Sequence, residues 1–293
     1  MALHVLENET LRVSVADEGA ELVSVIDKRS GAERLWQADP AVWNRHAPIL
    51  FPFVGKVVDG KYRLRGREYH MPTQHGFARD RVFACVQAVD DSVVHELSDT
   101  PETLESYPCP FRLRVRHSLD KAEPGRLRVS WEVENTGCET MFFAIGAHPG
   151  FLMPPDTRKE DCLIAFPGKQ TLRYFSADPK GFALPDAIKT LELSDSAAPY
   201  GDDMPETWIF QDQHIERVEL RRPDGSAFVA LDCPGFPLLA VWAKAEGPYI
   251  CLEPWYGRTD DAGFTGSVEE KPGEQALAPG ETLTYTYTIT FFA

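Results

Sequence analysis

The sequence contains none of the motifs that mark the best-known nucleotide and hydrolase sites. It has no G-x-x-x-x-G-K-[ST], no G-x-G-x-x-G after a strand, no H-E-x-x-H and no G-x-S-x-G. These absences exclude most P-loop, dinucleotide-binding, metalloprotease and serine-hydrolase interpretations. The eight histidines follow no metal-ligand spacing, since even the close pair His70 and His75 has Pro72 between them. We therefore expect neither a metal site nor a cofactor.

Long apolar runs and a secretory leader are also lacking. No apolar run approaches the roughly 18 residues that a membrane span needs, and the N-terminus has neither a basic nor an apolar leader region. The six cysteines are widely spaced without a C-x-x-C pair, which predicts reduced and mostly buried thiols. These features predict a cytoplasmic protein.

The overall charge limits the partners. The formal net charge is −15 at pH 7, and such an acidic surface repels nucleic acid and anionic membranes. We therefore expect a small-molecule ligand, and a few local arginines could still bind an anionic one. Hydrophobic residues make up 43% of the chain, which is sufficient for a large core. The oligomeric state is left open by the sequence.

The dominant pattern is an alternation of apolar and polar residues with a period of two. It is clearest over residues 111–116, 127–134 and 283–291. Each segment is predicted to be a strand with one buried and one solvated face. Asp59-Gly60, Arg65-Gly66 and Asp224-Gly225 separate alternating segments and are predicted to be hairpin turns.

Helical signals are few. The best candidate is short, with Thr100 as N-cap, Pro101 at the first helical position and a helix from Glu102 to Ser106. The many strands and turns predict an all-β fold, a large antiparallel β-sandwich with few short helices. We find no linker or repeat, so residues 1–293 are expected to form a single domain.

Three segments carry the candidate chemistry. They are Gln74–Asp80 around His75, Ala144–Phe151 around His148, and Tyr249–Gly257 with Glu253 followed by Trp255. Each has a structural alternative: a hydrogen-bonded histidine, a buried ion pair, or a core tryptophan. Taken together, two imidazoles, one carboxylate and an aromatic side chain indicate general acid–base chemistry on a polar ligand. A carbohydrate is one such ligand.

At these residues the sequence resembles the aldose 1-epimerase (galactose mutarotase) family, and within it the bacterial branch associated with lactose operons. The likeness spans nearly the whole chain, and the order of its pieces makes it specific. They are Trp43–Pro52, Val54–Lys56, Tyr62, His75–Asp80, Tyr107–Pro108, Gly146–Phe151, Leu252–Trp255, Glu270–Gly273 and Leu277–Glu281.

The resemblance implies a fold, a reaction and roles for particular residues. The fold is the galactose mutarotase-like supersandwich, and the reaction interconverts the α and β anomers of an aldohexose without a cofactor. Glu253 would be the general base on the anomeric hydroxyl, and His148 the general acid on the ring oxygen. His75 would help to position the sugar, and Trp255 would flank the pocket.

One departure from the family pattern concerns sugar binding. Lys56 stands where galactose mutarotases usually carry an arginine, and a lysine offers a point charge instead of a planar fork. Arg79 is the candidate to supply the missing fork. Arg45 and Arg79 together could also bind a phosphate, so a hexose-6-phosphate mutarotase is one alternative function. A non-catalytic carbohydrate-binding protein on the same fold is the other.

Overall fold

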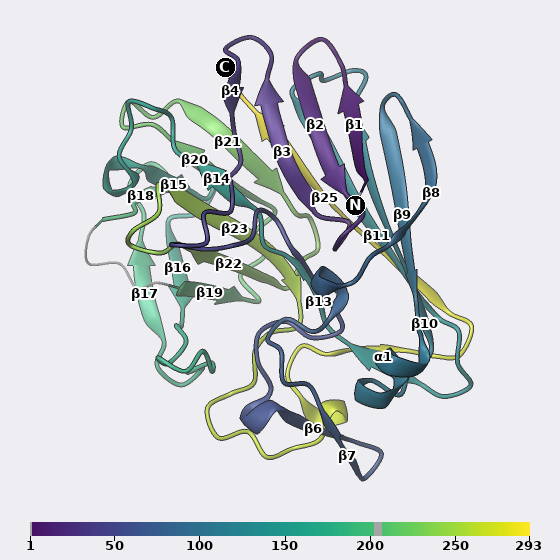
Figure 1. Cartoon of the computed structure of the whole chain (residues 1–293). Helices are drawn as coiled ribbons and strands as arrows, with labels where there is room; N and C mark the ends of the chain where they lie inside the picture. The colour runs from purple at the N-terminus through teal and green to yellow at the C-terminus, as the bar shows by residue number, and fades with distance from the viewer. Residues whose placement is uncertain (1, 202–206) are drawn as a thin grey trace.

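The computed structural model describes residues 2–201 and 207–293, and the statements below concern these residues. Strands dominate, their ladders are antiparallel, and helix is confined to short pieces (Figure 1). These pieces are α1 (Pro101–Ser106) and the 3-10 turns η1 (Val58–Gly60), η2 (Ala78–Asp80), η3 (Lys159–Asp161) and η4 (Val268–Glu270). The described residues contain no helix with the length and apolarity needed to cross a bilayer.

The largest sheet has nine strands among the described residues, and its centre is formed by the three segments with the clearest alternation. In sheet order the strands are β18 (Ala197–Pro199), β15 (Leu163–Ala165), β20 (Arg217–Arg221), β21 (Ala227–Asp232), β25 (Thr282–Phe291), β11 (Arg126–Asn135), β10 (Phe111–Leu119), β9 (Ser92–Ser98) and β8 (Ala84–Val89). The predicted strands are therefore confirmed. Trp131 lies opposite Tyr285 and Val115 in the buried layer of this sheet.

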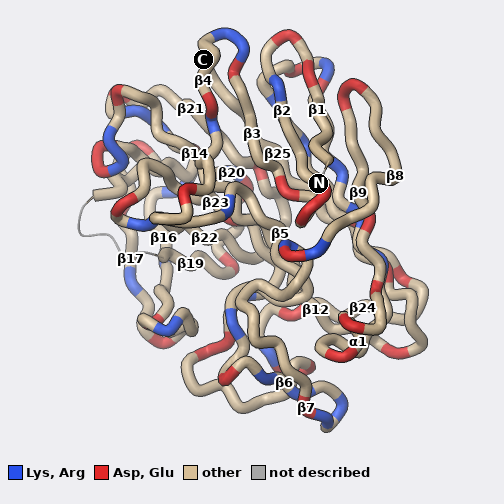
Figure 2. Tube along the Cα trace, in the orientation of Figure 1, with Lys and Arg blue, Asp and Glu red and all other residues tan. Residues whose placement is uncertain are grey.

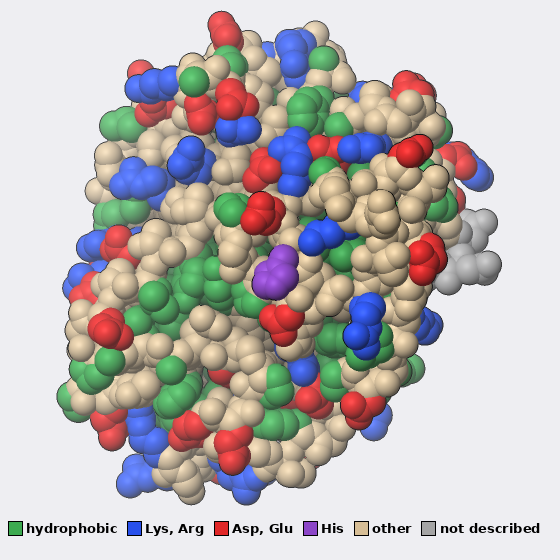
Figure 3. Space-filling view, turned by 180° about the vertical axis from the view of Figure 1, so that it is seen from behind, with side chains coloured by type: hydrophobic (Ala, Val, Ile, Leu, Met, Phe, Trp, Pro, Cys, Tyr) green, Lys and Arg blue, Asp and Glu red, His purple; other side chains and the backbone are tan. Residues whose placement is uncertain are grey.

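The polar positions of the same strands form ion pairs across the sheet. Arg114 contacts Glu96 at 2.7 Å and Glu132 at 2.8 Å, and Arg112 contacts Glu134 at 2.8 Å. Figure 2 shows acidic and basic residues interleaved along the whole trace, and the face in Figure 3 also mixes both signs. The net negative charge is thus spread over the surface.

A second, four-stranded sheet covers part of the first. It consists of β1 (Leu3–Glu7), β2 (Leu11–Ala16), β3 (Leu22–Asp27) and β4 (Ala32–Glu33). Alternate residues of β2, such as Val13, join the same buried cluster as Val129 of β11 and Ile289 of β25. Figure 1 shows β2 and β3 crossing in front of β25 and β11. This stacking of sheet on sheet confirms the predicted sandwich.

The third large sheet is buried on both faces. It contains β19 (Thr207–Gln211), β22 (Leu238–Trp242), β23 (Tyr249–Tyr256), β13 (Ile145–Ala147) and β5 (Ile49–Leu50), with β14 (Gly150–Leu152) also paired to β23. Its burial explains why β23 reads as an almost continuous apolar run instead of an alternating one.

Three smaller two-stranded ladders complete the strands, and they test the predicted turns. They are β6 (Lys61–Leu64) with β7 (Arg67–His70), β12 (Met141–Phe143) with β24 (Gln275–Leu277), and β16 (Thr171–Tyr174) with β17 (Lys189–Glu192). Arg65-Gly66 joins β6 to β7 and Asp224-Gly225 joins β20 to β21, as predicted.

One predicted hairpin turn is wrong, and the predicted helix is confirmed. Asp59-Gly60 lies in η1 before β6, because β6 pairs with the strand that follows it and not with one before Asp59. Helix α1 begins at Pro101 and is capped by Thr100, whose side chain accepts from the Thr103 N–H. The six cysteines are free thiols, four of them buried.

Candidate active site

Strand β23 places three of its side chains on one face. Because side chains alternate along a strand, Cys251, Glu253 and Trp255 point one way and Leu252 the other. Leu252 belongs to the main core, whereas Cys251 and Trp255 belong to two smaller buried clusters. Glu253 therefore lies between these smaller clusters, with only 1% of its surface exposed.

His148 meets this carboxylate from a neighbouring segment of the same sheet. It lies between β13 and β14, both of which pair with β23, and its backbone N–H donates to the carbonyl of Pro48 at 3.2 Å. His148 Nε2 lies 3.3 Å from Glu253 Oε2, and both side chains are buried. The antiparallel pairing thus brings together the two residues for which the sequence resemblance implies the acid and base roles.

Burial sets the protonation of this pair. Desolvation lowers the pKa of His148 to about 3, because the charged imidazolium is disfavoured inside the protein. Desolvation raises the pKa of Glu253 well above its ordinary value, for the same reason applied to a carboxylate. These opposite shifts favour the uncharged form of the pair, with a proton on Glu253 and none on His148, over the ion-pair form. Apart from the 3.3 Å contact with His148 Nε2, Glu253 Oε2 has no hydrogen-bond partner within the described residues, so a ligand hydroxyl could supply one.

The same pair has a third potential metal ligand beside it. The ligand atoms of His148, Cys251 and Glu253 lie within 4.8 Å of one another, and all three residues are buried. Burial raises the pKa of the Cys251 thiol well above its usual range, which keeps the sulfur protonated. The arrangement is thus a compact, proton-bearing site in which Cys251 contributes a neutral wall beside the carboxylate.

His75 faces His148 from a strained turn. The centroids of the two rings are 5.6 Å apart, and the planes are nearly perpendicular at 89°. His75 itself has a φ of 64°, and Gly76 follows with a φ of 67°. A Cβ on Gly76 would lie 2.3 Å from the Phe51 carbonyl oxygen, so only glycine fits there.

A backbone contact assigns the tautomer of His75. The Gly55 N–H donates to His75 Nδ1 at 3.0 Å, so this nitrogen is an acceptor and the ring proton is on Nε2. Desolvation, followed by the charges of His148, Arg79 and Lys56, lowers the pKa of His75 well below its usual value. His75 is thus a neutral hydrogen-bond donor beside His148.

Two tryptophans that the sequence patterns did not single out enclose His148. The ring centroids of Trp43 and Trp242 lie 4.9 Å and 5.2 Å from that of His148. Both tryptophans are partly exposed, and their own centroids are 5.3 Å apart. Trp242 is opposite Cys251 in the β22–β23 ladder. That cross-strand pairing, which the sequence does not reveal, is what places Trp242 at the site.

Trp255, predicted to flank the pocket, is almost fully buried in the structure. It is 6% exposed and packs against Gly146, where an added Cβ would lie 2.5 Å from the indole Cδ1. Gly146 lies opposite Trp255 in the β13–β23 ladder. The small residue on β13 therefore allows the indole to lie flat beside Glu253, and Trp255 forms the floor of the site more than its edge.

Two of the cationic residues predicted to bind the ligand, Lys56 and Arg45, have hydrogen-bonded protein partners, whereas Arg79 Nε has none among the described residues. Lys56 Nζ donates to the Lys180 carbonyl at 2.7 Å. Arg45 forms an ion pair with Asp80 and also donates to the Arg79 carbonyl at 3.1 Å. The Arg79 guanidinium is largely buried, and its Nε lies 3.9 Å from Asp80 Oδ2.

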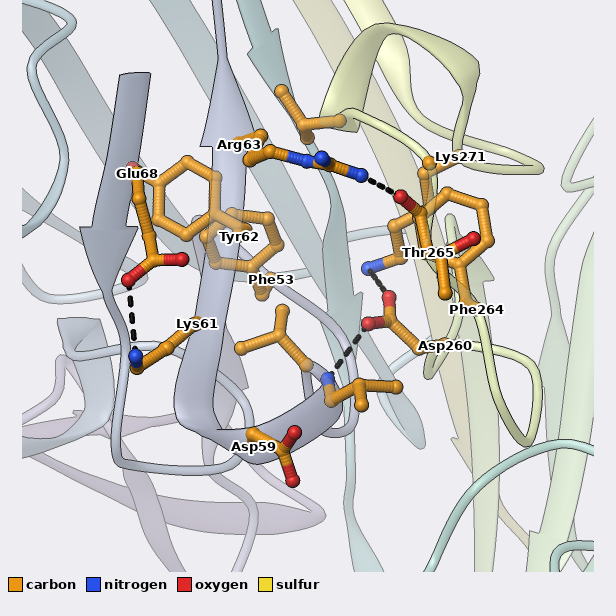
Figure 4. Close-up of a pocket in the computed structure, with 14 residues that line it drawn as sticks. Phe53, Asp59, Lys61, Tyr62, Arg63, Glu68, Asp260, Phe264, Thr265 and Lys271 are labelled. Carbon is orange, nitrogen blue, oxygen red and sulfur yellow. Dashed lines mark hydrogen bonds and ion pairs between the residues drawn. The ribbon is translucent and has the colours of Figure 1, made fainter. Parts of the chain in front are cut away.

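Figure 4 shows a separate cavity of about 340 Å³. Its lining comes from residues 53–59, the β6–β7 hairpin and residues 260–271, and it includes neither His148 nor Glu253. In it, Asp260 accepts from the Val58 N–H at 2.8 Å and lies 3.4 Å from Lys271 Nζ. These contacts fix the loop that carries Lys56, whose N–H donates to Thr259 Oγ1.

Known proteins are similar to this chain in both sequence and fold. The family model for aldose 1-epimerase matches residues 2–290. The chromosomal protein LacX of Lactococcus lactis subsp. lactis is 32% identical over 300 residues, which cover 97% of this chain and 98% of LacX.

Solved structures agree. A galactose mutarotase related enzyme from Lactobacillus acidophilus superposes with a TM-score of 0.93 at 30% identity, covering 100% of this chain and 98% of that one. A galactose mutarotase-like protein from Lactobacillus casei ATCC 334 has a TM-score of 0.89 at 29% identity, covering 99% and 100%. Because the family model and the LacX relative both span almost its whole length, this chain belongs to the aldose 1-epimerase family.

Proposed function

We propose that the protein is a mutarotase that interconverts the α and β anomers of a neutral aldohexose by general acid–base catalysis. The observation that carries this proposal is the buried contact of 3.3 Å between His148 Nε2 and Glu253 Oε2. A pair that holds one proton contains one acid and one base at once. With two protons it would lack the base, and with none it would lack the acid.

The reaction uses that proton and returns it. Burial favours the proton on Glu253 in the free site. Its transfer to His148 Nε2 across the 3.3 Å contact gives the ion-pair form, in which Glu253 is a carboxylate and His148 is an imidazolium. Glu253 takes the proton from the anomeric hydroxyl while His148 donates one to the ring oxygen, and the bond between the anomeric carbon and the ring oxygen breaks. The aldehyde end then rotates. Ring closure on its other face reverses both proton transfers and yields the other anomer, as microscopic reversibility requires.

The neighbouring residues support binding of a sugar ring. Trp43 and Trp242 offer partly exposed aromatic faces beside His148, and such faces stack on the C–H side of a sugar. We assign His75 as a donor near the ring oxygen, because its Nδ1 already accepts from Gly55 and its proton is on Nε2. Trp255 holds the position of Glu253 from the floor of the site.

The charge balance favours a neutral substrate over a phosphorylated one. Asp80 forms an ion pair with Arg45 and lies 3.9 Å from Arg79, so it offsets part of the positive charge. Lys56 donates to a backbone carbonyl. A phosphate bound at Arg45 and Arg79 would lie near the Asp80 carboxylate and be repelled by it, whereas a neutral sugar hydroxyl would not.

Polarimetry tests the proposal. Freshly dissolved α-glucose, α-galactose and glucose 6-phosphate are followed with and without the protein, and the spontaneous rate is subtracted. We expect the neutral sugars to relax faster. Glu253→Gln should lower the enzymatic rate by about 10²-fold or more, since it removes the base and keeps the volume. His148→Asn should have a similar effect on the acid step.

Matched controls separate chemistry from folding. Glu219→Gln and His117→Asn change a buried carboxylate on β20 and a buried imidazole on β10, and both should keep the wild-type rate. A fully active Glu253→Gln enzyme would exclude Glu253 as the base, and a fully active His148→Asn enzyme would move the acid role to His75. Sugar binding without any acceleration would instead indicate a non-catalytic binding protein, and a preference for glucose 6-phosphate would indicate the phosphorylated substrate.

A further inference from the structure

A second group of potential metal ligands lies away from the candidate active site, where the N-terminal strands meet the edge of the nine-stranded sheet. His4 comes from β1, Asp17 follows β2, Cys85 comes from β8 and His95 from β9. Figure 1 shows β1 beside β9 and β8. Cys85 and His95 are direct partners in the β8–β9 ladder, and a bulge follows Cys85 immediately. A bulge of this kind often changes the direction in which a neighbouring side chain points.

The four residues form one connected cluster. The ligand atoms of His4, Cys85 and His95 all lie within 4.8 Å of one another. Asp17 Oδ1 is 2.8 Å from His4 Nε2 and 3.3 Å from His95 Nε2, so one carboxylate oxygen joins the two imidazoles. The imidazole centroids are 5.1 Å apart at an interplanar angle of 73°.

Hydrogen bonding within the protein leaves this cluster incompletely satisfied. His95 is fully buried, yet its Nδ1 has no hydrogen-bond partner among the described residues. The Cys85 sulfur has only a long contact of 3.6 Å to the Gln87 carbonyl oxygen. Buried polar atoms without a partner are costly and rare. A bound cation would draw on the ring nitrogens and the thiolate together.

The ligand types select the cation. Imidazole nitrogen with thiolate sulfur is a set typical of Zn²⁺, whereas Ca²⁺ and Mg²⁺ prefer oxygen alone. Zinc bonds of about 2.0–2.3 Å in a tetrahedron place ligand atoms about 3.3–3.8 Å apart. The upper limit of 4.8 Å on the separations found here is about 1 Å beyond that range, and the exposure of His4 and Cys85 leaves room for the side-chain rotations that would close the difference.

We propose that His4, Cys85 and His95 bind Zn²⁺, and that Asp17, whose carboxylate contacts Nε2 of both histidines, orients the two imidazoles. The site ties the first strand and the β2–β3 turn to β8 and β9, so the metal acts as a clamp between the two sheets. The histidine spacing in the sequence does not reveal it, because each ligand comes from a different segment. The proposal is independent of the reaction assigned to His148 and Glu253.

Metal titration tests the clamp directly. Tag-free, reduced protein is titrated with Zn²⁺ by calorimetry and with Co²⁺ in the near-ultraviolet, where a thiolate ligand gives a charge-transfer band. We expect one ion per chain at this site and a thiolate band. Cys85→Ser should abolish the band and the binding event, whereas Cys138→Ser, at the other exposed cysteine, should preserve both. His4→Gln should weaken Zn²⁺ binding about tenfold or more.

A second variant keeps the result specific to this cluster. His148, Cys251 and Glu253 are also close enough to share an ion, so the titration is repeated with Cys251→Ala, which should retain the thiolate band. Zn²⁺ should raise the melting temperature of the wild type and of Cys138→Ser but not that of Cys85→Ser. The proposal is overturned if the wild type shows no thiolate band, or if Cys85→Ser binds the ions as tightly as Cys138→Ser.

Discussion

Replacing Glu253 by glutamine should change how the stability of the protein depends on pH. In the wild type, burial raises the pKa of Glu253 and lowers that of His148 to about 3. The native state therefore keeps a proton on the carboxyl that the unfolded chain loses above pH 4.5. In the native state the His148 imidazole also stays neutral below pH 6.5, where the same group in the unfolded chain binds a proton.

The two effects have opposite signs. Glu253 lowers the free energy of unfolding by about 1.4 kcal/mol per pH unit as pH rises above 4.5, because the native state binds the extra proton. His148 raises that free energy by about 1.4 kcal/mol per unit between pH 3 and 6.5, because there the unfolded state binds the extra proton. Between pH 4.5 and 6.5 the two contributions oppose each other. Glu253→Gln removes only the first, so its stability relative to the wild type should increase as pH rises from 4.5 towards the raised pKa of Glu253, with a slope of at most about 1.4 kcal/mol per pH unit.

Urea unfolding at pH 4.5, 5.5 and 6.5 measures this difference, since the other titrating groups are common to both proteins. Glu219→Gln is the control. The pKa of Glu219 is lowered overall by its bonds to Arg217 and Arg221, although burial, its largest single influence, opposes this. The difference in free energy of unfolding between Glu219→Gln and the wild type should therefore stay constant above pH 4.5. A Glu253→Gln difference that is equally flat would refute the buried one-proton pair.

Three further outcomes are expected. Trp43→Ala should raise KM about 3- to 10-fold with a smaller change in kcat, because the sugar loses one stacking surface. Polarimetry at several sugar concentrations measures both constants, and an unchanged KM would mean that the sugar binds elsewhere. Gly76→Ala should lower the free energy of unfolding by about 2–5 kcal/mol, because the added Cβ would collide with the Phe51 carbonyl oxygen and because the residue has a positive φ. Urea unfolding measures this, and a midpoint equal to that of the wild type would contradict the tight turn. The profile of kcat/KM against pH should show no inflection near 6.5 that depends on His148, because burial lowers the pKa of His148 to about 3. An inflection there that His148→Asn removes would overturn this assignment.

Local patterns in the sequence were sufficient for the most regular strands and for helix α1. The alternation over residues 111–116, 127–134 and 283–291 predicts strands because a half-buried strand needs a period of two. The cap at Thr100 and the proline at 101 predict α1 because both act within one helical turn. Asp59-Gly60 was mistaken for a hairpin turn because its residues suit that turn locally, while strand pairing decides which segments it joins.

Only the tertiary structure decided which groups meet. His148 and Glu253 are far apart in the sequence and come within 3.3 Å because β13 and β14 both pair with β23. The ladder of β22 with β23 brings Trp242 to the same place. Long-range pairing also gives Arg45 a partner in Asp80, and it assembles His4, Cys85 and His95 from three strands. Such contacts depend on strand order and register across the whole chain, and no local spacing encodes them.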